Sequence, residues 1–140
     1  MKKIKFFWIC SFIVIGVALM ISGSCKKKDD NPTSPQVPVF TVTADSVMLQ
    51  TGDEGLQFFG KCTNENVKMT KVTITSPVSV QTSTYLLNGN SFVKNTPFSL
   101  QEDNTAYNKE LGTWNFTFVG NRTADNVSFS VNSTLSISVK

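Results

Sequence analysis

The chain has 140 residues, a formal net charge of +3 and no histidine. The missing histidine excludes Ser-His-Asp and Cys-His nucleophilic sites and removes the commonest metal ligand. The positive charge belongs to the first 30 residues, because residues 31–140 hold seven cations against eight anions. A domain with that balance lacks the electrostatic footprint of a nucleic-acid binder, so we expect no nucleic-acid partner.

The N-terminus carries the pattern of an export signal. Three lysines among the first five residues precede an uncharged, mostly apolar run of 16 residues, Phe6 to Ile21. As a helix this run spans about 24 Å, which is short for a bilayer core that needs about 20 apolar residues. The small residues Ser22, Gly23 and Ser24 then lead into Cys25. We predict a cleaved signal peptide at 1–24, with an uncleaved membrane anchor as the alternative.

The residues around Cys25 resemble a bacterial lipoprotein signal. The stretch Ile21-Ser22-Gly23-Ser24-Cys25 is similar to a lipobox, in which the cysteine is diacylated and the chain is cut before it. The run Lys28-Asp29-Asp30 resembles the Lys-acid-acid run of Bacteroidetes-type lipoproteins, which is associated with surface export. The resemblance implies a lipid anchor on Cys25 in the outer membrane, with the protein facing the periplasm or the outside. Ordinary secretory cleavage after Ser24 is the alternative.

Residues 25–38 indicate a polar tether. They contain three prolines and few apolar groups, and their 13 steps would reach about 43 Å when fully extended. The domain beyond them holds a single cysteine, Cys62, so no internal disulfide is expected.

Residues 39–140 predict one all-β domain. At the C-terminus the apolar residues hold odd positions and Ser, Asn or Thr the even ones. The apolar members of this row are Val127, Phe129, Val131, Leu135, Ile137 and Val139. Ser133 interrupts the row, which predicts that the strand bends or passes an edge at Asn132-Ser133. An aromatic row of the same period precedes it, so the two form a predicted hairpin. We assign five side chains of these rows to the core: Trp114, Phe116, Phe118, Phe129 and Val131.

Shorter strand signals lie upstream. The alternation from Phe40 to Ala44 reverses parity afterwards, which predicts a kink near Asp45. Leu56, Phe58 and Cys62 share one face, which places Cys62 inward as a small core residue rather than a reactive thiol. Pro77 ends a further strand because proline cannot donate to a ladder. Asn88-Gly89 predicts a type I′ hairpin turn. Seven or eight short strands with frequent turns are typical of a sandwich.

The stretch Glu110-Leu111-Gly112-Thr113-Trp114 looks like the acid-x-Gly-x-Tyr pattern that leads into strand F of immunoglobulin-like domains. Trp114 stands where the tyrosine is usual, and the paired cysteines of antibody domains are missing. The resemblance implies a single immunoglobulin-like antiparallel β-sandwich over residues 39–140.

Carboxylates offer weak candidates for chemistry. Glu102 and Asp103 with Glu110 could act as a glycosidase pair, although a solvated loop is the simpler interpretation. Asp53-Glu54 beside two glycines hints at calcium but lacks the spacing of a known loop, so we predict a turn. Four N-x-S/T sequons are by-products of a Ser/Thr/Asn-rich composition. We therefore expect no catalytic residue, no metal and no cofactor.

Asp45-Ser46-Val47 resembles the Asp-Ser/Thr-apolar sequon of Bacteroidetes-type periplasmic O-glycosylation. The resemblance implies a glycan on Ser46, at a predicted kink where the hydroxyl can be reached. The alternative is that Asp45 and Ser46 turn the backbone through local side-chain hydrogen bonds.

Three functional classes remain open. The first is a non-catalytic, lipid-anchored envelope module that binds a glycan or a protein or has an accessory role. The second is a small β-barrel carrier of an apolar ligand. The third is an enzyme, which the missing histidine disfavours.

Both modifications can be tested on the intact protein. Labelled palmitate should enter the chain in a host with lipoprotein processing, because the cysteine thiol is the acyl acceptor, and the label should be lost in Cys25→Ala. Label that survives this change contradicts lipidation at Cys25.

The intact mass of protein from its native host should exceed that of the lipidated chain, because a glycan on Ser46 adds mass, and the excess should vanish in Ser46→Ala. Excess mass that persists assigns the sugar elsewhere.

Overall fold

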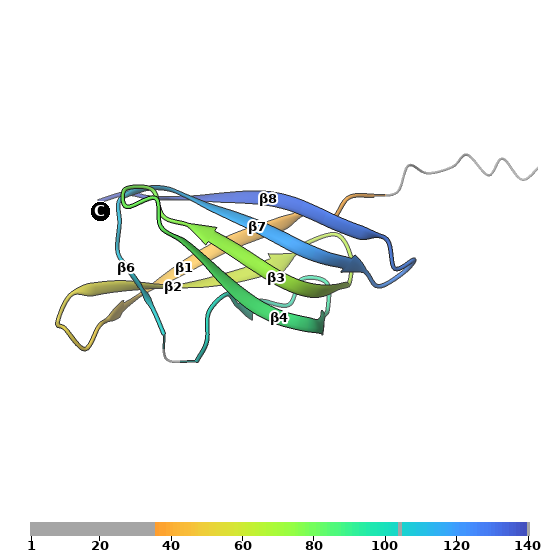
Figure 1. Ribbon diagram of the computed structural model, residues 1–140, viewed down its shortest axis with the longest axis horizontal. Helices are drawn as coiled ribbons and strands as arrows, with labels where there is room; N and C mark the ends of the chain where they lie inside the picture. The colour runs from red at the N-terminus through yellow and green to blue at the C-terminus, as the bar shows by residue number, and fades with distance from the viewer. Residues whose placement is uncertain (1–35, 104, 140) are drawn as a thin grey trace, which may run out of the picture. The chain divides into compact units, whose positions relative to one another are not determined.

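The computed structural model describes residues 36–103 and 105–139, which form one compact unit of eight strands in two antiparallel sheets (Figure 1). The all-β prediction is thereby confirmed. The predicted signal peptide, Cys25 and most of the predicted tether lie outside the described residues. In the part of the chain that the structure describes, no helix is long and apolar enough to cross a membrane.

The first sheet has the order β1-β2-β5, with β6 also paired to β2, and the second has the order β4-β3-β7-β8. The strands are β1 (Phe40–Met48), β2 (Glu54–Cys62), β3 (Val67–Thr75), β4 (Thr82–Phe92), β5 (Phe98–Ser99), β6 (Tyr107–Asn108), β7 (Gly112–Arg122) and β8 (Ser128–Ile137). The hairpins β1–β2, β3–β4 and β7–β8 each stay within one sheet, and the connections after β2, β4 and β6 cross between sheets. This is the two-layer arrangement of a sandwich. Its immunoglobulin-like type stays a prediction.

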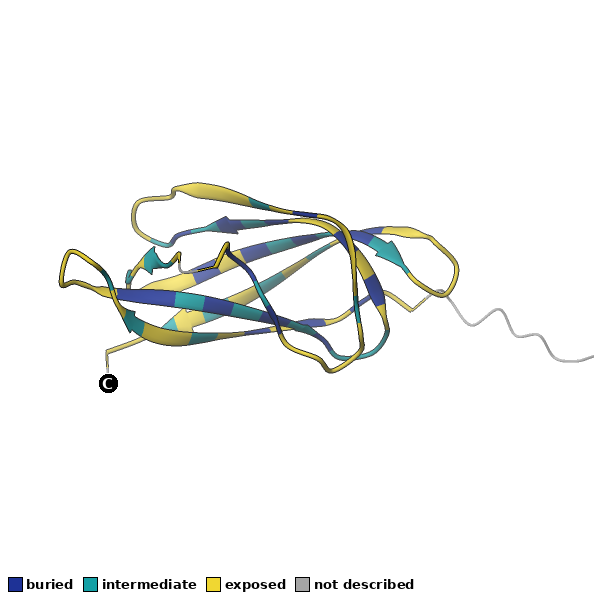
Figure 2. Cartoon of the chain, turned by 90° about the horizontal axis from the view of Figure 1, so that it is seen from below, coloured by how far each residue is buried: buried dark blue, intermediate teal, exposed yellow. Residues whose placement is uncertain are grey.

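The core lies between the two sheets, where every second residue of each strand points inward. Figure 2 shows the resulting alternation of buried and exposed residues along the strands. Phe58 from β2 and Phe116 and Phe118 from β7 are completely buried, and Trp114 and Phe129 are buried beside them. Val131, which was assigned to the core, is only half-buried and packs against it, because β8 is an edge strand covered on one side.

Trp114 combines packing with a hydrogen bond. Its side chain is 2% exposed, and its indole Nε1 donates to the backbone oxygen of Glu110 at 3.0 Å. A tyrosine at this position of an immunoglobulin-like domain would make its own bond to backbone a few residues upstream. The indole N–H therefore supplies the local link that a tyrosine hydroxyl would otherwise make.

The prediction of a hairpin turn at Asn88-Gly89 is wrong. Both residues have the expected positive φ, 49° and 80°, but they lie inside β4 and form a bulge. Three residues of β4 stand opposite Thr70 alone, because Met69 pairs with Asn90 and Lys71 with Leu86. Left-handed residues fit a bulge as well as a turn. The chain reverses instead between β3 and β4, at residues 76–81.

Neither predicted bend is accompanied by a bulge. β1 pairs with β2 from Phe40 to Met48 without a register shift, and the parity of its less exposed residues changes after Ala44, as the sequence indicates. β8 pairs with β7 just as regularly through Asn132-Ser133. Ser133 faces inward, and its hydroxyl donates to the Phe40 backbone oxygen at 3.1 Å. A polar residue is tolerated in the apolar row because this bond satisfies it and joins the edges of the two sheets.

Replacing Trp114 should separate its two contributions. Trp114→Ala should lower the free energy of unfolding by about 3–5 kcal/mol, and Trp114→Phe, which keeps a ring but loses the N–H, by about 1–3 kcal/mol. Chemical denaturation followed by circular dichroism measures both, since the domain has no other tryptophan to report by fluorescence. A cooperative Trp114→Ala domain of normal stability would contradict this account of the core.

Candidate functional site at the far end of the sandwich

The sandwich has two ends of different character. The N-terminal end holds Val37 and Val39, the β2–β3 turn at residues 63–66 and the β7–β8 loop at residues 123–127. The opposite end, here called the far end, holds the β1–β2 turn, the β3–β4 loop, residues 109–111 and the end of β8 (Figure 1). Pairing of Thr75 with Asn115 and of Gly112 with Ile137 fixes these last elements side by side.

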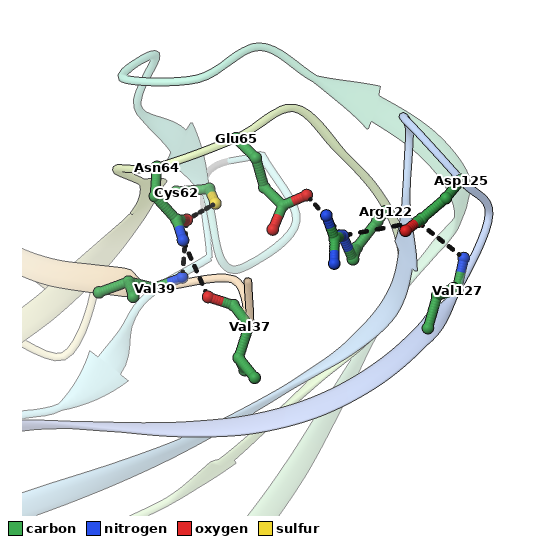
Figure 3. Close-up of polar contacts among 8 residues, drawn as sticks. All are labelled: Val37, Val39, Cys62, Asn64, Glu65, Arg122, Asp125 and Val127. Atoms are coloured by element: carbon green, nitrogen blue, oxygen red, sulfur yellow. Dashed lines mark hydrogen bonds and ion pairs between the residues drawn. The ribbon is translucent and has the colours of Figure 1, made fainter. Parts of the chain in front are cut away.

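Polar contacts tie the N-terminal end together (Figure 3). The Asn64 side chain accepts from Val39 N at 2.9 Å and donates to Val37 O at 2.8 Å. The buried Cys62 thiol donates to the same Asn64 oxygen at 3.4 Å. The thiol is thus a satisfied core group, and Val37 and Val39 are fixed to the β2–β3 turn.

An ion-pair cluster closes the same end. The Arg122 guanidinium lies 2.9 Å from a Glu65 oxygen and 3.5 Å from an Asp125 oxygen (Figure 3). Arg122 and Glu65 are largely buried, and Arg122 Nη1 and Glu65 Oε1 have no hydrogen-bond partner in the structure. The cluster connects the β2–β3 turn to the β7–β8 hairpin. Removing either Arg122 or Glu65 would leave the other as a buried charge without its counter-ion, which is strongly destabilising.

At the far end the sheets separate and leave a groove between β1 and β8. Its volume is about 730 Å³. Residues of β1, β2, the 109–111 segment and β8 line it: Ala44, Ser46, Glu54, Leu56, Lys109, Leu111, Ser136, Ile137, Ser138 and Val139. Lys109 forms an ion pair with Glu54 within it. The groove thus offers aliphatic surface, hydroxyls and one neutralised charge pair.

The backbone edge of β1 is unpaired along this groove. Thr63 N donates to Val39 O and Leu49 N donates to Asp53 O, at the two ends of the β1–β2 ladder. Hydrogen bonding alternates in an antiparallel pair, so odd-numbered residues of β1 bond to β2 and even-numbered residues direct N–H and C=O away from it. Ala44 and Ser46 therefore present free backbone groups at the groove.

Exposed aliphatic side chains are common at the far end, and two of them, Leu111 and Val139, line the groove. In the described part of the chain ten large hydrophobic side chains are exposed, and half of them lie at the far end: Met48, Val78, Val80, Leu111 and Val139. Val80 has φ 52°, a left-handed conformation that is costly for a β-branched residue. Backbone strain of this kind persists only where surrounding contacts over-determine it.

Glu110 provides those contacts. Its carboxylate accepts from Val78 N at 2.9 Å, from Ser79 N at 3.1 Å and from the Ser79 hydroxyl at 2.6 Å. These bonds, led by that of the Ser79 hydroxyl, hold the pKa of Glu110 below its ordinary value, because each of them favours the charged form. Glu110 thereby fastens the β3–β4 loop to the start of β7 and fixes the exposed Val78 and Val80.

The structure separates the carboxylates considered from sequence. Glu110 is occupied by the β3–β4 loop, whereas Glu102 and Asp103 lie in another hollow beside Gln57 and Phe59. Asp53 lies in the predicted turn and accepts from the Thr51 hydroxyl at 2.9 Å. Within residues 36–103 and 105–139 no three Cys, Asp or Glu side chains gather as metal ligands.

Ser46 lies inside β1 opposite Leu56, and its side chain is exposed at the groove. A hydroxyl in this position remains open to modification, and glycosylation of Ser46 stays a prediction.

The contacts that shape this end have no local sequence signal. The sequence pattern placed Glu110 just before a strand, but its partner Ser79 lies 31 residues away, and the ion pair of Lys109 joins residues 55 positions apart. The groove itself depends on how far two sheets separate, which no local pattern encodes. Comparison with known proteins finds no matching family model, no matching curated protein and no matching solved structure.

Removing the Glu110 charge should destabilise the domain in a pH-dependent way. Because the folded-state pKa is lowered, the stabilisation is complete above the unfolded value, about 4.3, and is lost as pH falls through the folded value. Glu110→Gln should therefore unfold at lower denaturant concentration than wild type at pH 7, and the difference should shrink below about pH 4. Glu102→Gln, an exposed loop carboxylate, is the matched control. A difference that is unchanged at pH 3 would contradict the charge-dependent contacts.

Proposed function

We propose that this chain is a lipid-anchored, non-catalytic module of the cell envelope that binds an extended segment of a partner protein at its far end. The observation that carries the proposal is the coincidence, in one groove, of an unpaired strand edge and exposed aliphatic side chains. Edges of this kind take an added strand, whose backbone bonds provide affinity and whose alternate side chains enter pockets. Leu111, Ile137 and Val139 offer the apolar surface that such side chains require.

The position of the groove supports the same function. A lipid on Cys25 would hold the N-terminal end nearest the membrane, and the groove lies at the opposite end of the domain. The β3–β4 loop beside it is rigid through Glu110, so a partner would meet a preformed surface. Preformed surfaces bind with a smaller loss of conformational entropy.

Protein is favoured over glycan by the chemistry of the exposed groups. All ten large hydrophobic side chains exposed in the described part of the chain are Val, Leu or Met. The aromatic rings that would stack on a sugar are buried or half-buried there. A carrier of an apolar ligand would need an open interior, whereas aromatic and aliphatic side chains fill the space between these sheets.

Site-specific photo-crosslinking in the native cell tests the proposal. A photoreactive residue at Ser138, in the groove, should yield one discrete adduct that protease removes and glycosidase does not. The same residue at Thr41, exposed on β1 near the N-terminal end, is the matched control and should yield no such adduct. Leu111→Ser should reduce the Ser138 adduct several-fold. Equal labelling from both positions, or an adduct that only glycosidase removes, would overturn binding of a protein in the groove.

A further inference from the structure

The free edge of β4 is a second surface with the features of a strand-pairing site. β4 pairs only with β3 and forms one margin of the second sheet (Figure 1). No charged residue occurs from Val72 to Val93. Leu86, in the middle of this stretch, has 61% of its surface exposed. Natural proteins protect open edges with charges, prolines or bulges, and β4 uses only the bulge after Leu86.

The other sheet margins differ from β4. β1 carries the exposed Asp45, and the hydroxyl of Ser133 on β8 bonds to Phe40 on β1, so these two edges face each other. β5 and β6 have two residues each, and the charged residues Glu102, Asp103 and Lys109 flank them. β8 also lacks charged residues but is joined to β1 by the Ser133 bond, whereas the segment of β4 before its bulge is neutral and pairs only with β3.

Hydrogen-bond alternation identifies which residues of β4 are free. Ser76 N donates to Gln81 O at 3.0 Å where the β3–β4 hairpin begins. Residues 81, 83 and 85 therefore bond to β3, and Thr82, Thr84 and Leu86 direct N–H and C=O away from it. These three residues form a continuous row of unpaired donors and acceptors on the margin of the sheet.

We infer that β4 pairs with β4 of a second copy of this chain, antiparallel and with Thr84 on the two-fold axis. In this register Thr82 stands opposite Leu86 of the partner, and Thr84 stands opposite its own copy. The free groups of all three residues are then satisfied, and the bulge at Asn88-Gly89 ends the ladder on each side.

Charge favours a second copy as the occupant. A two-fold pairing brings each residue near the same residue of the other chain, so any charge close to the axis would meet a like charge. The neutral stretch from Val72 to Val93 avoids this repulsion. Threonine opposite threonine and Leu86 opposite threonine are favourable cross-strand pairs. The same surface needs no complementary partner sequence, because it complements itself.

This inference goes beyond the proposed function, since it uses β4 and leaves the groove between β1 and β8 open. Antiparallel pairing reverses the long axis of one domain relative to the other. The two N-terminal ends therefore point in opposite directions, a geometry that joins copies carried on two facing surfaces.

Disulfide trapping tests the register. Paired Thr84 residues would have Cα atoms about 5.5 Å apart, within the range that a disulfide spans. Mild oxidation of full-length Thr84→Cys protein in detergent should give a covalent dimer on a non-reducing gel. Thr43→Cys, an exposed threonine on β1, is the matched control and should stay monomeric. Equal cross-linking of the two variants would overturn the pairing.

Sedimentation of the detergent-solubilised, full-length protein tests the association itself. Thr84→Lys should raise the dimer dissociation constant at least about tenfold, because two lysines would meet at the axis, and Thr43→Lys should leave it unchanged. Circular dichroism of each variant serves as the control that it is folded. A wild type that stays monomeric at the highest concentration reached, or a dimer that survives Thr84→Lys, would overturn the inference. Leu111→Ser should not affect dimerisation, so failure here is separable from failure of the groove proposal.

Discussion

The packing of Phe58 against β7 holds the two sheets together. Its ring centroid lies 4.8 Å from that of Trp114 and 5.1 Å from that of Phe116, and all three side chains are buried. Phe40 and Phe118 stack across the sheets in the same way, with centroids 4.2 Å apart. Such pairs contribute about 0.5–1.5 kcal/mol each beyond the area that they bury. Within the described domain Cys62 has no second cysteine with which to form a disulfide, so side-chain packing alone joins the two sheets at this level.

This core fixes the middle of the sandwich and leaves its two ends to be closed by other means. At the N-terminal end, Asn64 and the Glu65–Arg122–Asp125 cluster close it with polar contacts. At the far end the sheets separate beyond Ser133, and the surface there is aliphatic and partly unpaired. Glu110 holds the β3–β4 loop against the segment that leads into β7. The difference between the ends therefore follows from which polar side chains each loop carries.

The fold was predictable where one residue type repeats with the period of a strand. The rows around Trp114 and Phe129 predicted β7, β8 and four of the buried core side chains, because inward and outward positions differ strongly in polarity there. The turn predicted at Asn88-Gly89 was wrong because positive φ angles occur both in hairpin turns and in bulges. Only the pairing of β4 with β3 decides between the two. The role of Ser133 in the apolar row could not be predicted, because its hydrogen-bond acceptor, the backbone oxygen of Phe40, is 93 residues away in the sequence. The groove escaped prediction for the same reason, since it arises from long-range contacts and from the ends of strands.

The ladder between β1 and β2 has a mechanical consequence. It begins at Val39, next to the point where the N-terminal segment joins the domain, and continues without interruption to Met48. A partner held at the far end and an anchor beyond Val37 would pull the domain along the direction of its strands. Such a pull loads the hydrogen bonds of the ladder in shear, so that they resist together instead of opening one after another.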